Sequence, residues 1–281
     1  MITITSRQNS VVRAFRELAD APDPSGARVL LDGLHLVREA HAAGVIFEAI
    51  AVGASQLEAN TEEAMFAHTL EREHIELISA TEPVLAAMSP VRTPSGIVAI
   101  GLRKATTASA ICEQENAFIL VAVDVQDPGN LGSLIRAAEA GGANGMLVCG
   151  ASANPFSWKS LRGSMGSALR LPVAGGLTIE DALAQVKAGG MSMVAAVPRN
   201  GRAPDAVDWS GRVALFIGGE GPGLSRSLVA AAGQRVAVPM APPVESLNVA
   251  VAGAILIYAA SWQRTPPLDT ARGGLSDSRR P

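Results

Sequence analysis

The second half of the chain is a series of short apolar runs, each followed by a turn rich in glycine or proline and then by a helical pattern. The first run, 118–125, is apolar at nearly every position, as expected of a parallel strand that is buried on both faces. The later runs and the predicted helices cover residues 131–140, 145–148, 179–187, 193–197, 213–217 and 247–262. This alternation predicts a parallel α/β domain.

The first hundred residues have shorter elements, which predict a small α/β sandwich. The predicted helices and strands cover residues 10–18, 28–31, 34–43 and 49–52, and a further helix opens at 61–63. Two prolines in 88–96 and a polar stretch after them predict a domain boundary. We therefore expect an N-terminal domain at 1–103, a linker at 104–116, a second domain at 117–264 and a disordered tail at 265–281.

Composition and hydropathy restrict the class of protein. With 281 residues, 48% of them hydrophobic and 17% charged, the chain is expected to fold into two well-packed domains. The start lacks an apolar signal segment, and the longest apolar run, 249–260, is too short to cross a bilayer, so we predict a cytoplasmic protein with no membrane partner. Cys112 and Cys149 form no CxxC pair and are predicted to be reduced.

Charge gives little information about partners. The net charge is −3, and the second half is the more basic one. This excess is too small to imply a polyanionic partner by itself. All four histidines lie in the first half, so chemistry in the second domain has no local histidine base, and no metal site is predicted.

The segment 124–132 ends the first strand of the second domain and opens its helix. Pro128 and Gly129 predict a turn, and Asn130 is a candidate N-cap. Arg136 follows on a helix of small and apolar residues. It either forms an ion pair with Glu139, three residues on, or reaches a partner, and both interpretations remain open.

Two further segments each join an apolar run to a predicted helix. Residues 218–223 form a glycine loop with Glu220 in its middle, but match neither the Walker loop nor the dinucleotide fingerprint. Ser246 is a natural N-cap for the last helix, and Asn248 prefers a cap to a helix interior. Because the first main-chain N–H groups of a helix lack partners, two such loops together predict a cofactor site.

In this order, the segments resemble the three motifs of the SpoU/TrmH branch of SPOUT RNA methyltransferases. The first contains Asn130 and Arg136, the second is 218–223, and the third combines 238–240 with 246–250. The stretch 162–166 is similar to the family's Arg-x-Ser-x-Gly segment. The first hundred residues resemble the ribosomal-protein-like substrate-binding domain of the family, notably at 4–9, 29–37 and 93–98.

The resemblance implies a C-terminal domain with a trefoil knot, S-adenosylmethionine as cofactor and a homodimer formed through that domain. It implies transfer of a methyl group to a ribose 2′-hydroxyl of structured RNA, with 23S rRNA favoured over tRNA. The implied catalytic residues are Arg136, Asn130, Glu220, Ser246 and Asn248. The implied cofactor-binding residues are Gly218, Gly219, Val238, Met240 and Leu247.

The reaction itself can be argued from chemistry. Methyl transfer from a sulfonium needs the acceptor oxygen placed behind the methyl carbon and a proton removed as the bond forms. Because a guanidinium is a poor base, we interpret Arg136 as a phosphate clamp that stabilises the developing alkoxide. Predicted RNA contacts are Arg7, Arg13, Arg92 and Arg162. With only 4% aromatic residues, recognition is expected to use RNA shape and backbone.

Four alternatives were weighed. A ribose methyltransferase acting on tRNA stays open. A knotted methyltransferase that modifies a base nitrogen is disfavoured by the Ser-Leu-Asn motif at 246–248. A catalytically silent ribosome-assembly factor is disfavoured by the presence of Asn130, Arg136, Glu220 and Asn248. A nucleotide-binding oxidoreductase is disfavoured because its fingerprint is missing.

Overall fold

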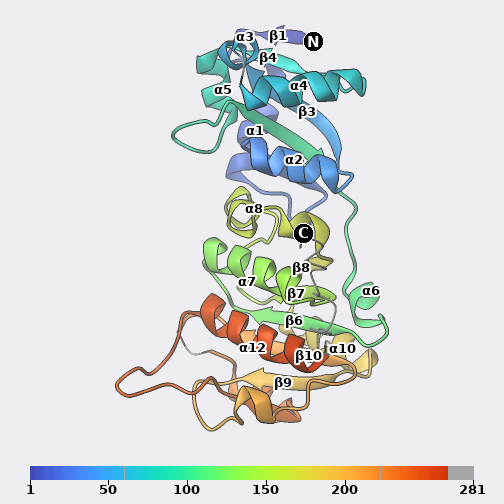
Figure 1. Ribbon diagram of the computed structural model, residues 1–281, viewed down its shortest axis with the longest axis vertical. Coiled ribbons are helices and arrows are strands. Elements are labelled where there is room, and N and C mark those ends of the chain that lie inside the picture. The colour runs from blue at the N-terminus through green and yellow to red at the C-terminus, as the bar shows by residue number, and fades with distance from the viewer. Residues whose placement is uncertain (60, 222, 265–281) are drawn as a thin grey trace, which may run out of the picture.

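The computed structural model describes residues 1–59, 61–221 and 223–264 and contains two sheets, one in each half of the chain (Figure 1). The predicted tail, 265–281, and Pro222 of the glycine loop lie outside the described residues. Within the described part of the chain, none of the helices has the length and apolar character needed to cross a membrane.

The N-terminal sheet has the strand order β1-β4-β3-β5-β2, in which β5 runs antiparallel to both of its neighbours. Its strands are β1 (Ile2–Ile4), β2 (Arg28–Asp32), β3 (Ile46–Gly53), β4 (Ile78–Ala80) and β5 (Ile97–Leu102). The accompanying helices are α1 (Ser10–Asp20), α2 (Leu34–Ala42), α3 (Ala54–Glu58), α4 (Glu62–Arg72) and α5 (Glu82–Met88). Helices α1 and α5 share one buried apolar cluster with the sheet, and α2 and α4 share another. The predicted α/β sandwich is confirmed.

The C-terminal sheet is parallel throughout, with the order β11-β9-β10-β6-β7-β8. Its strands are β6 (Phe118–Val123), β7 (Gly145–Cys149), β8 (Val173–Leu177), β9 (Ser192–Ala196), β10 (Val213–Gly218) and β11 (Gln234–Val236). The helical elements are α6 (Ala108–Cys112), α7 (Pro128–Ala140), α8 (Trp158–Ser164), α9 (Ser167–Arg170), α10 (Ile179–Ala188), the 3-10 turn η1 (Pro204–Ala206), α11 (Arg226–Ala231) and α12 (Val249–Arg264). The predicted parallel α/β domain is confirmed.

Strand β6 explains the layered core of this domain. Its side chains alternate between the two faces of the sheet, so Phe118 and Leu120 join the cluster under α7 and α12, while Ile119 and Val121 join the cluster under α6 and α10 (Figure 1). All six residues of β6 are buried. This is why the sequence of the strand is apolar at consecutive positions.

Part of the predicted linker 104–116 is helical. Residues Ala108–Cys112 form α6, and Ile111 and Cys112 are buried against the C-terminal sheet. The apolar residues of this turn are too few to show a helical period among their polar neighbours. Both cysteines are free and buried, and burial raises the pKa of the Cys149 thiol to about 12.

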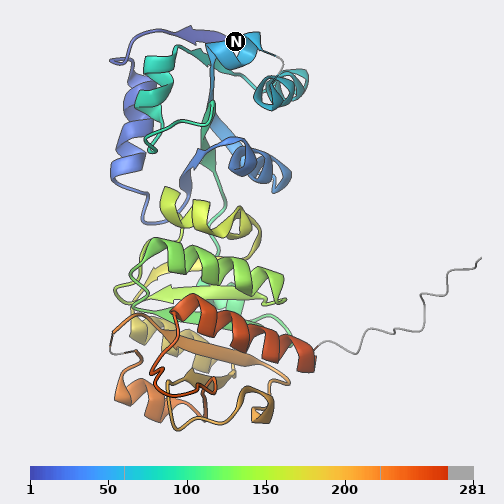
Figure 2. The same cartoon turned by 60° about the vertical axis from the view of Figure 1, so that its left-hand side comes forward.

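Helix α8 packs at the contact between the N-terminal and C-terminal domains. It packs against β2 on one side and α7 on the other, so it lies between the two sheets (Figure 2). Arg170, the last residue of the next helix, α9, forms ion pairs with Glu39 of α2 and Glu139 of α7. The Arg103 guanidinium lies 3.8 Å from the centre of the Phe156 ring, and burial lowers its pKa to about 10. These contacts hold the N-terminal domain on α7 and α8.

The close approach of α7 and α8 requires glycine at position 132. A Cβ atom on Gly132 would lie 2.5 Å from the main-chain oxygen of Ser160 and 2.8 Å from the nitrogen of Ser164. We expect Gly132→Ala to lower the free energy of unfolding by about 1–3 kcal/mol, because the overlap is with main chain. Urea unfolding followed by circular dichroism measures this change.

Gly233→Ala is the matched control. Its Cβ would have 3.9 Å of space from the nearest atom, the oxygen of Met193, and its φ is not in the left-handed region. It is expected to leave stability unchanged or to raise it by up to about 1 kcal/mol. Equal destabilisation by the two substitutions would show that the α7–α8 contact is not tight.

Candidate functional site

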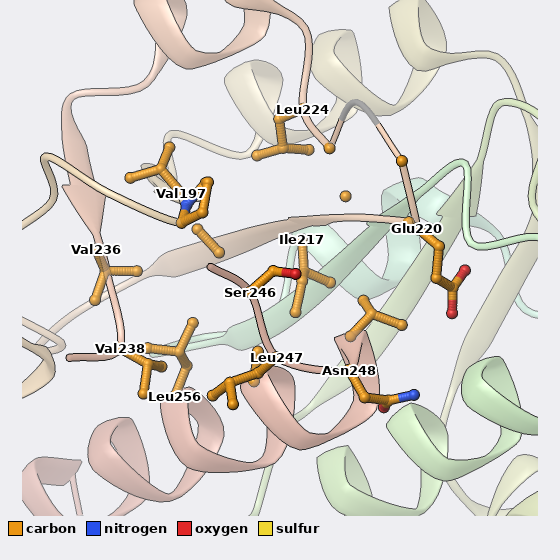
Figure 3. Close-up of a pocket in the computed structure, with 18 of the residues that line it drawn as sticks. Val197, Ile217, Glu220, Leu224, Val236, Val238, Ser246, Leu247, Asn248 and Leu256 are labelled. Atoms are coloured by element: carbon orange, nitrogen blue, oxygen red, sulfur yellow. The ribbon is translucent and has the colours of Figure 1, made fainter. Parts of the chain in front are cut away.

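A cavity of about 400 Å³ lies at the carboxyl ends of β9, β10 and β11. In a parallel sheet, these ends share one edge, so the loops that follow the strands meet there. The cavity is lined by residues after β9, by the glycine loop after β10, and by residues between β11 and α12 (Figure 3). Val197, Val236 and Val238 lie toward one end, and the polar side chains of Glu220 and Asn248 lie toward the other.

The glycine loop packs main chain directly on main chain. Gly218 pairs with Val123 of β6, and the N–H of Gly219 donates to the Val123 oxygen at 2.8 Å. A Cβ on Gly218 would lie 2.5 Å from the carbonyl carbon of Gly223, and one on Gly219 would overlap the Asp124 oxygen. No side chain fits at either position. The two glycines therefore let the loop run directly beside the end of β6, and the opposite side of the loop faces the cavity.

Side chains from the three predicted motifs meet at the mouth of this cavity. The Asn130 amide nitrogen donates to a Glu220 carboxylate oxygen, and the Asn248 amide nitrogen donates to the Asn130 oxygen at 3.0 Å. Glu220 and Asn248 both line the cavity. One amide therefore joins segments that are 90 and 118 residues distant from it in sequence.

Asn248, and not Ser246, caps the last helix. The Asn248 side-chain oxygen accepts from the N–H groups of Ala250 at 2.9 Å and Val251 at 3.3 Å. The predicted cap at Ser246 and the predicted start at Leu247 are therefore wrong. Residues 246 and 247 lie before the helix, outside regular secondary structure, and both line the cavity.

The predicted N-cap role of Asn130 is also wrong. Helix α7 begins at Pro128, and the Asp127 side chain accepts from the N–H of Asn130 at 2.7 Å. Proline fits the first helical position because its fixed φ suits a helix and its missing N–H is not needed there. Asp127 takes the capping role, so the Asn130 amide is available for Glu220 and Asn248.

Arg136 lies apart from this group. It is exposed on α7, six residues after Asn130, which is about 9 Å along a helix. Glu139, the ion-pair partner considered from the sequence, binds Arg170 instead at 2.7 Å. Among the described residues, Arg136 has no hydrogen bond or ion pair, and it does not line the cavity.

The remaining predicted residues divide into two groups. The five predicted to bind the cofactor all line the cavity: Gly218, Gly219, Val238, Met240 and Leu247. The four predicted to contact RNA are all exposed and lie outside the cavity lining: Arg7, Arg13, Arg92 and Arg162.

Sequence reasoning missed one wall of the cavity. Val197 and Pro198, directly after β9, line it together with apolar side chains such as Leu224 and Leu256. The signal was present, because Pro198 follows an apolar run in a parallel domain. Val197 and Pro198 reach the cavity because β9 lies beside β10 in the sheet, and the order of the strands was not predicted.

Comparison with known proteins identifies the family. Residues 117–258 match the model of the SpoU rRNA Methylase family. An uncharacterized tRNA/rRNA methyltransferase of Synechocystis is 32% identical over 263 residues, covering 93% of this chain and 94% of that protein. The chain belongs to the SpoU rRNA methylase family. It is therefore an RNA methyltransferase.

Two more relatives of this SpoU methyltransferase are informative. The 23S rRNA (guanosine(2553)-2′-O)-methyltransferase RlmP of Bacillus subtilis is 29% identical over 263 residues, which cover 92% of this chain and 98% of that protein. The crystal structure of an AdoMet-bound rRNA methyltransferase from Sinorhizobium meliloti has a TM-score of 0.80 at 27% identity, covering 94% of this chain and 98% of that one. The predicted α/β class with its parallel sheet and the predicted cofactor, S-adenosylmethionine, are confirmed, and the trefoil knot stays a prediction.

Loss of the Asn248 side chain should affect both the last helix and the cavity. We expect Asn248→Ala to lower the unfolding free energy by about 1–2 kcal/mol, as for other lost N-caps. It should also weaken S-adenosylmethionine binding, because the side-chain oxygen of Asn130 loses its hydrogen-bond donor. Thermal unfolding and isothermal titration calorimetry measure the two effects.

Asn9→Ala is the control, since Asn9 caps α1 through the N–H of Val11 at 2.9 Å, far from the cavity. This substitution should lower the unfolding free energy by a similar amount but leave the affinity for S-adenosylmethionine unchanged. An equal loss of affinity in both variants would mean that binding follows global stability.

Proposed function

We propose that this SpoU methyltransferase methylates a ribose 2′-hydroxyl of ribosomal RNA, with S-adenosylmethionine in the cavity behind the glycine loop. The observation that carries the proposal is the meeting of Asn130, Glu220 and Asn248 at the mouth of that cavity. The similarity to a Bacillus enzyme that methylates a guanosine ribose of 23S rRNA supports the reaction and the substrate class.

The cavity suits the cofactor in size and lining. Small-molecule sites commonly measure about 300–1,000 Å³ and are mostly apolar, with a few polar groups that fix orientation. The cavity has about 400 Å³, with main chain at Gly218 and Gly219 and apolar side chains at Val238 and Leu247. When bound, S-adenosylmethionine supplies a methyl group on a positively charged sulfur.

The polar group at the mouth positions the reactants. Glu220 is fixed by Asn130, which is itself held by Asn248, so the glycine loop and the start of α12 keep one relative position. Orientation accounts for much of the catalysis when two substrates must meet in line. Arg136, exposed and without an ion-pair partner among the described residues, would bind a phosphate beside the target ribose and stabilise the developing negative charge.

RNA binding is assigned to the N-terminal domain and α8. Arg7, Arg13, Arg92 and Arg162 are exposed and free of ion pairs among the described residues, so they can meet phosphates. Arg103 and Arg170 are instead engaged at the domain interface. We favour ribosomal RNA over tRNA as the substrate because of the similarity to the Bacillus enzyme, and a ribosomal substrate agrees with the predicted cytoplasmic location.

Deletion of the gene should remove one or a few 2′-O-methyl groups from ribosomal RNA, and the wild-type gene should restore them. Arg136→Lys should restore less than about a tenth of the methylation rate, because a lysine cannot replace a bidentate guanidinium. Sequencing-based mapping of 2′-O-methylation measures both. A missing methyl group that appears only in tRNA would support the tRNA alternative, and near-normal turnover of Arg136→Lys would contradict the phosphate clamp.

The surface of α12 supports the predicted homodimer. Four large apolar residues follow one face of the helix with spacings of four, three and four: Val251, Ile255, Tyr258 and Trp262. They are 50%, 40%, 39% and 76% exposed. An apolar stripe on a helix is normally buried against another element. A second copy of this chain fits, because α12 is self-complementary when two copies pack about a twofold axis.

Placing a charge in this stripe should break the dimer. We expect Ile255→Glu to sediment as a monomer at micromolar concentration, where the wild type sediments as a dimer, since an unpaired carboxylate would be buried. Met65→Glu is the control, because Met65 is 60% exposed on α4, away from α12. A monomeric wild type, or an unchanged Ile255→Glu dimer, would exclude α12 as the interface.

A further inference from the structure

The loop between α5 and β5, residues 89–96, lies on the same side of the molecule as the loops of the cofactor cavity. Figure 1 shows it projecting to the left, the side on which the chain between β11 and α12 projects from the C-terminal domain. It contains Arg92, which is exposed. A long RNA that reaches the cavity can therefore contact this loop along the same face.

A single carboxylate joins both ends of this loop. The Ser89 hydroxyl donates to one oxygen of Asp32 at 2.6 Å, and the Ser95 hydroxyl donates to the other at 3.4 Å. The N–H of Val91 donates to the Ser89 hydroxyl at 3.3 Å. A chain of hydrogen bonds thus runs from Asp32 to the residue that precedes Arg92.

The same carboxylate faces the C-terminal domain. Asp32 is the last residue of β2, the strand against which α8 packs. Burial raises the pKa of Asp32, while the Ser89 hydroxyl and the positive charge of Arg162 on α8 lower it. Asp32 thus holds the loop that carries Arg92 and lies close enough to Arg162 of the other domain for that charge to lower its pKa.

A structural role alone does not require a carboxylate here. Closing a loop of this length needs only hydroxyl or main-chain partners, and a half-buried charge costs free energy unless it is compensated. A negative charge does add one property, because it accepts two hydroxyls at once and attracts a guanidinium. A carboxylate can therefore fix the loop that carries one arginine and attract a second arginine to the same surface. It does so without forming a direct ion pair that would neutralise either guanidinium.

We propose that Asp32 is a positioning residue for RNA, which clamps the loop 89–96 so that Arg92 and Arg162 present one phosphate-binding surface on the side of the molecule where the cavity loops project. Asp32 does not touch the RNA in this arrangement. It acts through Arg92, by fixing the loop, and it keeps the surface continuous from the N-terminal domain to α8. The proposal rests on the function proposed above and names the residues that hold its substrate.

A double-mutant cycle tests the proposal with large-subunit ribosomal RNA from cells that lack the gene. Arg92→Ala should raise the KM for this RNA about tenfold and reduce the slope of log affinity against log salt by about 1, the value for one lost phosphate contact. Asp32→Asn should raise the KM about fivefold, with kcat and S-adenosylmethionine affinity unchanged. The double variant should be no worse than Arg92→Ala, because residues that act through one another are not additive.

Hydrogen exchange provides a readout that needs no RNA. In Asp32→Asn, the amides of residues 90–95 should exchange at least several-fold faster than in the wild type, while those of β2 remain protected. Asp208→Asn is the matched control, because Asp208 accepts from the Ser210 hydroxyl at 2.6 Å in a different loop. It should change neither the KM nor the exchange of 90–95. Asp32→Glu, which keeps the carboxylate, should recover part of the lost RNA affinity.

The outcomes separate this proposal from the proposed function. Effects of Asp32→Asn and Arg92→Ala that multiply in the double variant, or unchanged exchange in 90–95, would overturn the role of Asp32 alone. Wild-type protein that binds no ribosomal RNA would overturn the proposed function and the RNA role of Asp32 together.

Discussion

The site depends on the pairing of β6 with β10. These strands lie side by side in register, with Gly218 opposite Val123, so the first motif and the glycine loop leave the sheet at the same level. Asp124 then turns the chain with a φ of 55°, and the absence of a side chain on Gly219 lets the second loop pass its carbonyl group. Asn130 and Glu220 can meet only because both main chains run this close.

Long, strongly patterned elements were predictable because burial determined their sequences. Strand β6 is apolar at every position since helices cover both of its faces, and this pattern gave its position correctly. Short elements left no such pattern. Strand β11 has three residues, two of them polar, and β8 contains two glycines, so neither was predicted. Their places are set by pairing with β9 and β7, which a single sequence does not show.

Two of the predicted site residues have other structural roles than the sequence suggested. Both helix starts were displaced, because Pro128 allowed α7 to begin earlier and Asn248 moved the start of α12 later. The two asparagines were known from the sequence, but their contact was not, since it joins residues 118 positions apart. The catalytic role of Arg136 was implied by the family resemblance, and the structure places this residue on α7 outside the cavity lining.

The ion pairs of Arg170 have a consequence for substrate choice. One guanidinium binds Glu39 on α2 of the N-terminal domain and Glu139 on α7, the helix that carries Asn130 and Arg136. These ion pairs fix the distance between the N-terminal domain, which we propose to bind RNA, and the helix beside the cavity. Under the proposed function, an RNA must span that distance to reach both places, so it would be selected by the separation between two of its parts as well as by its local sequence.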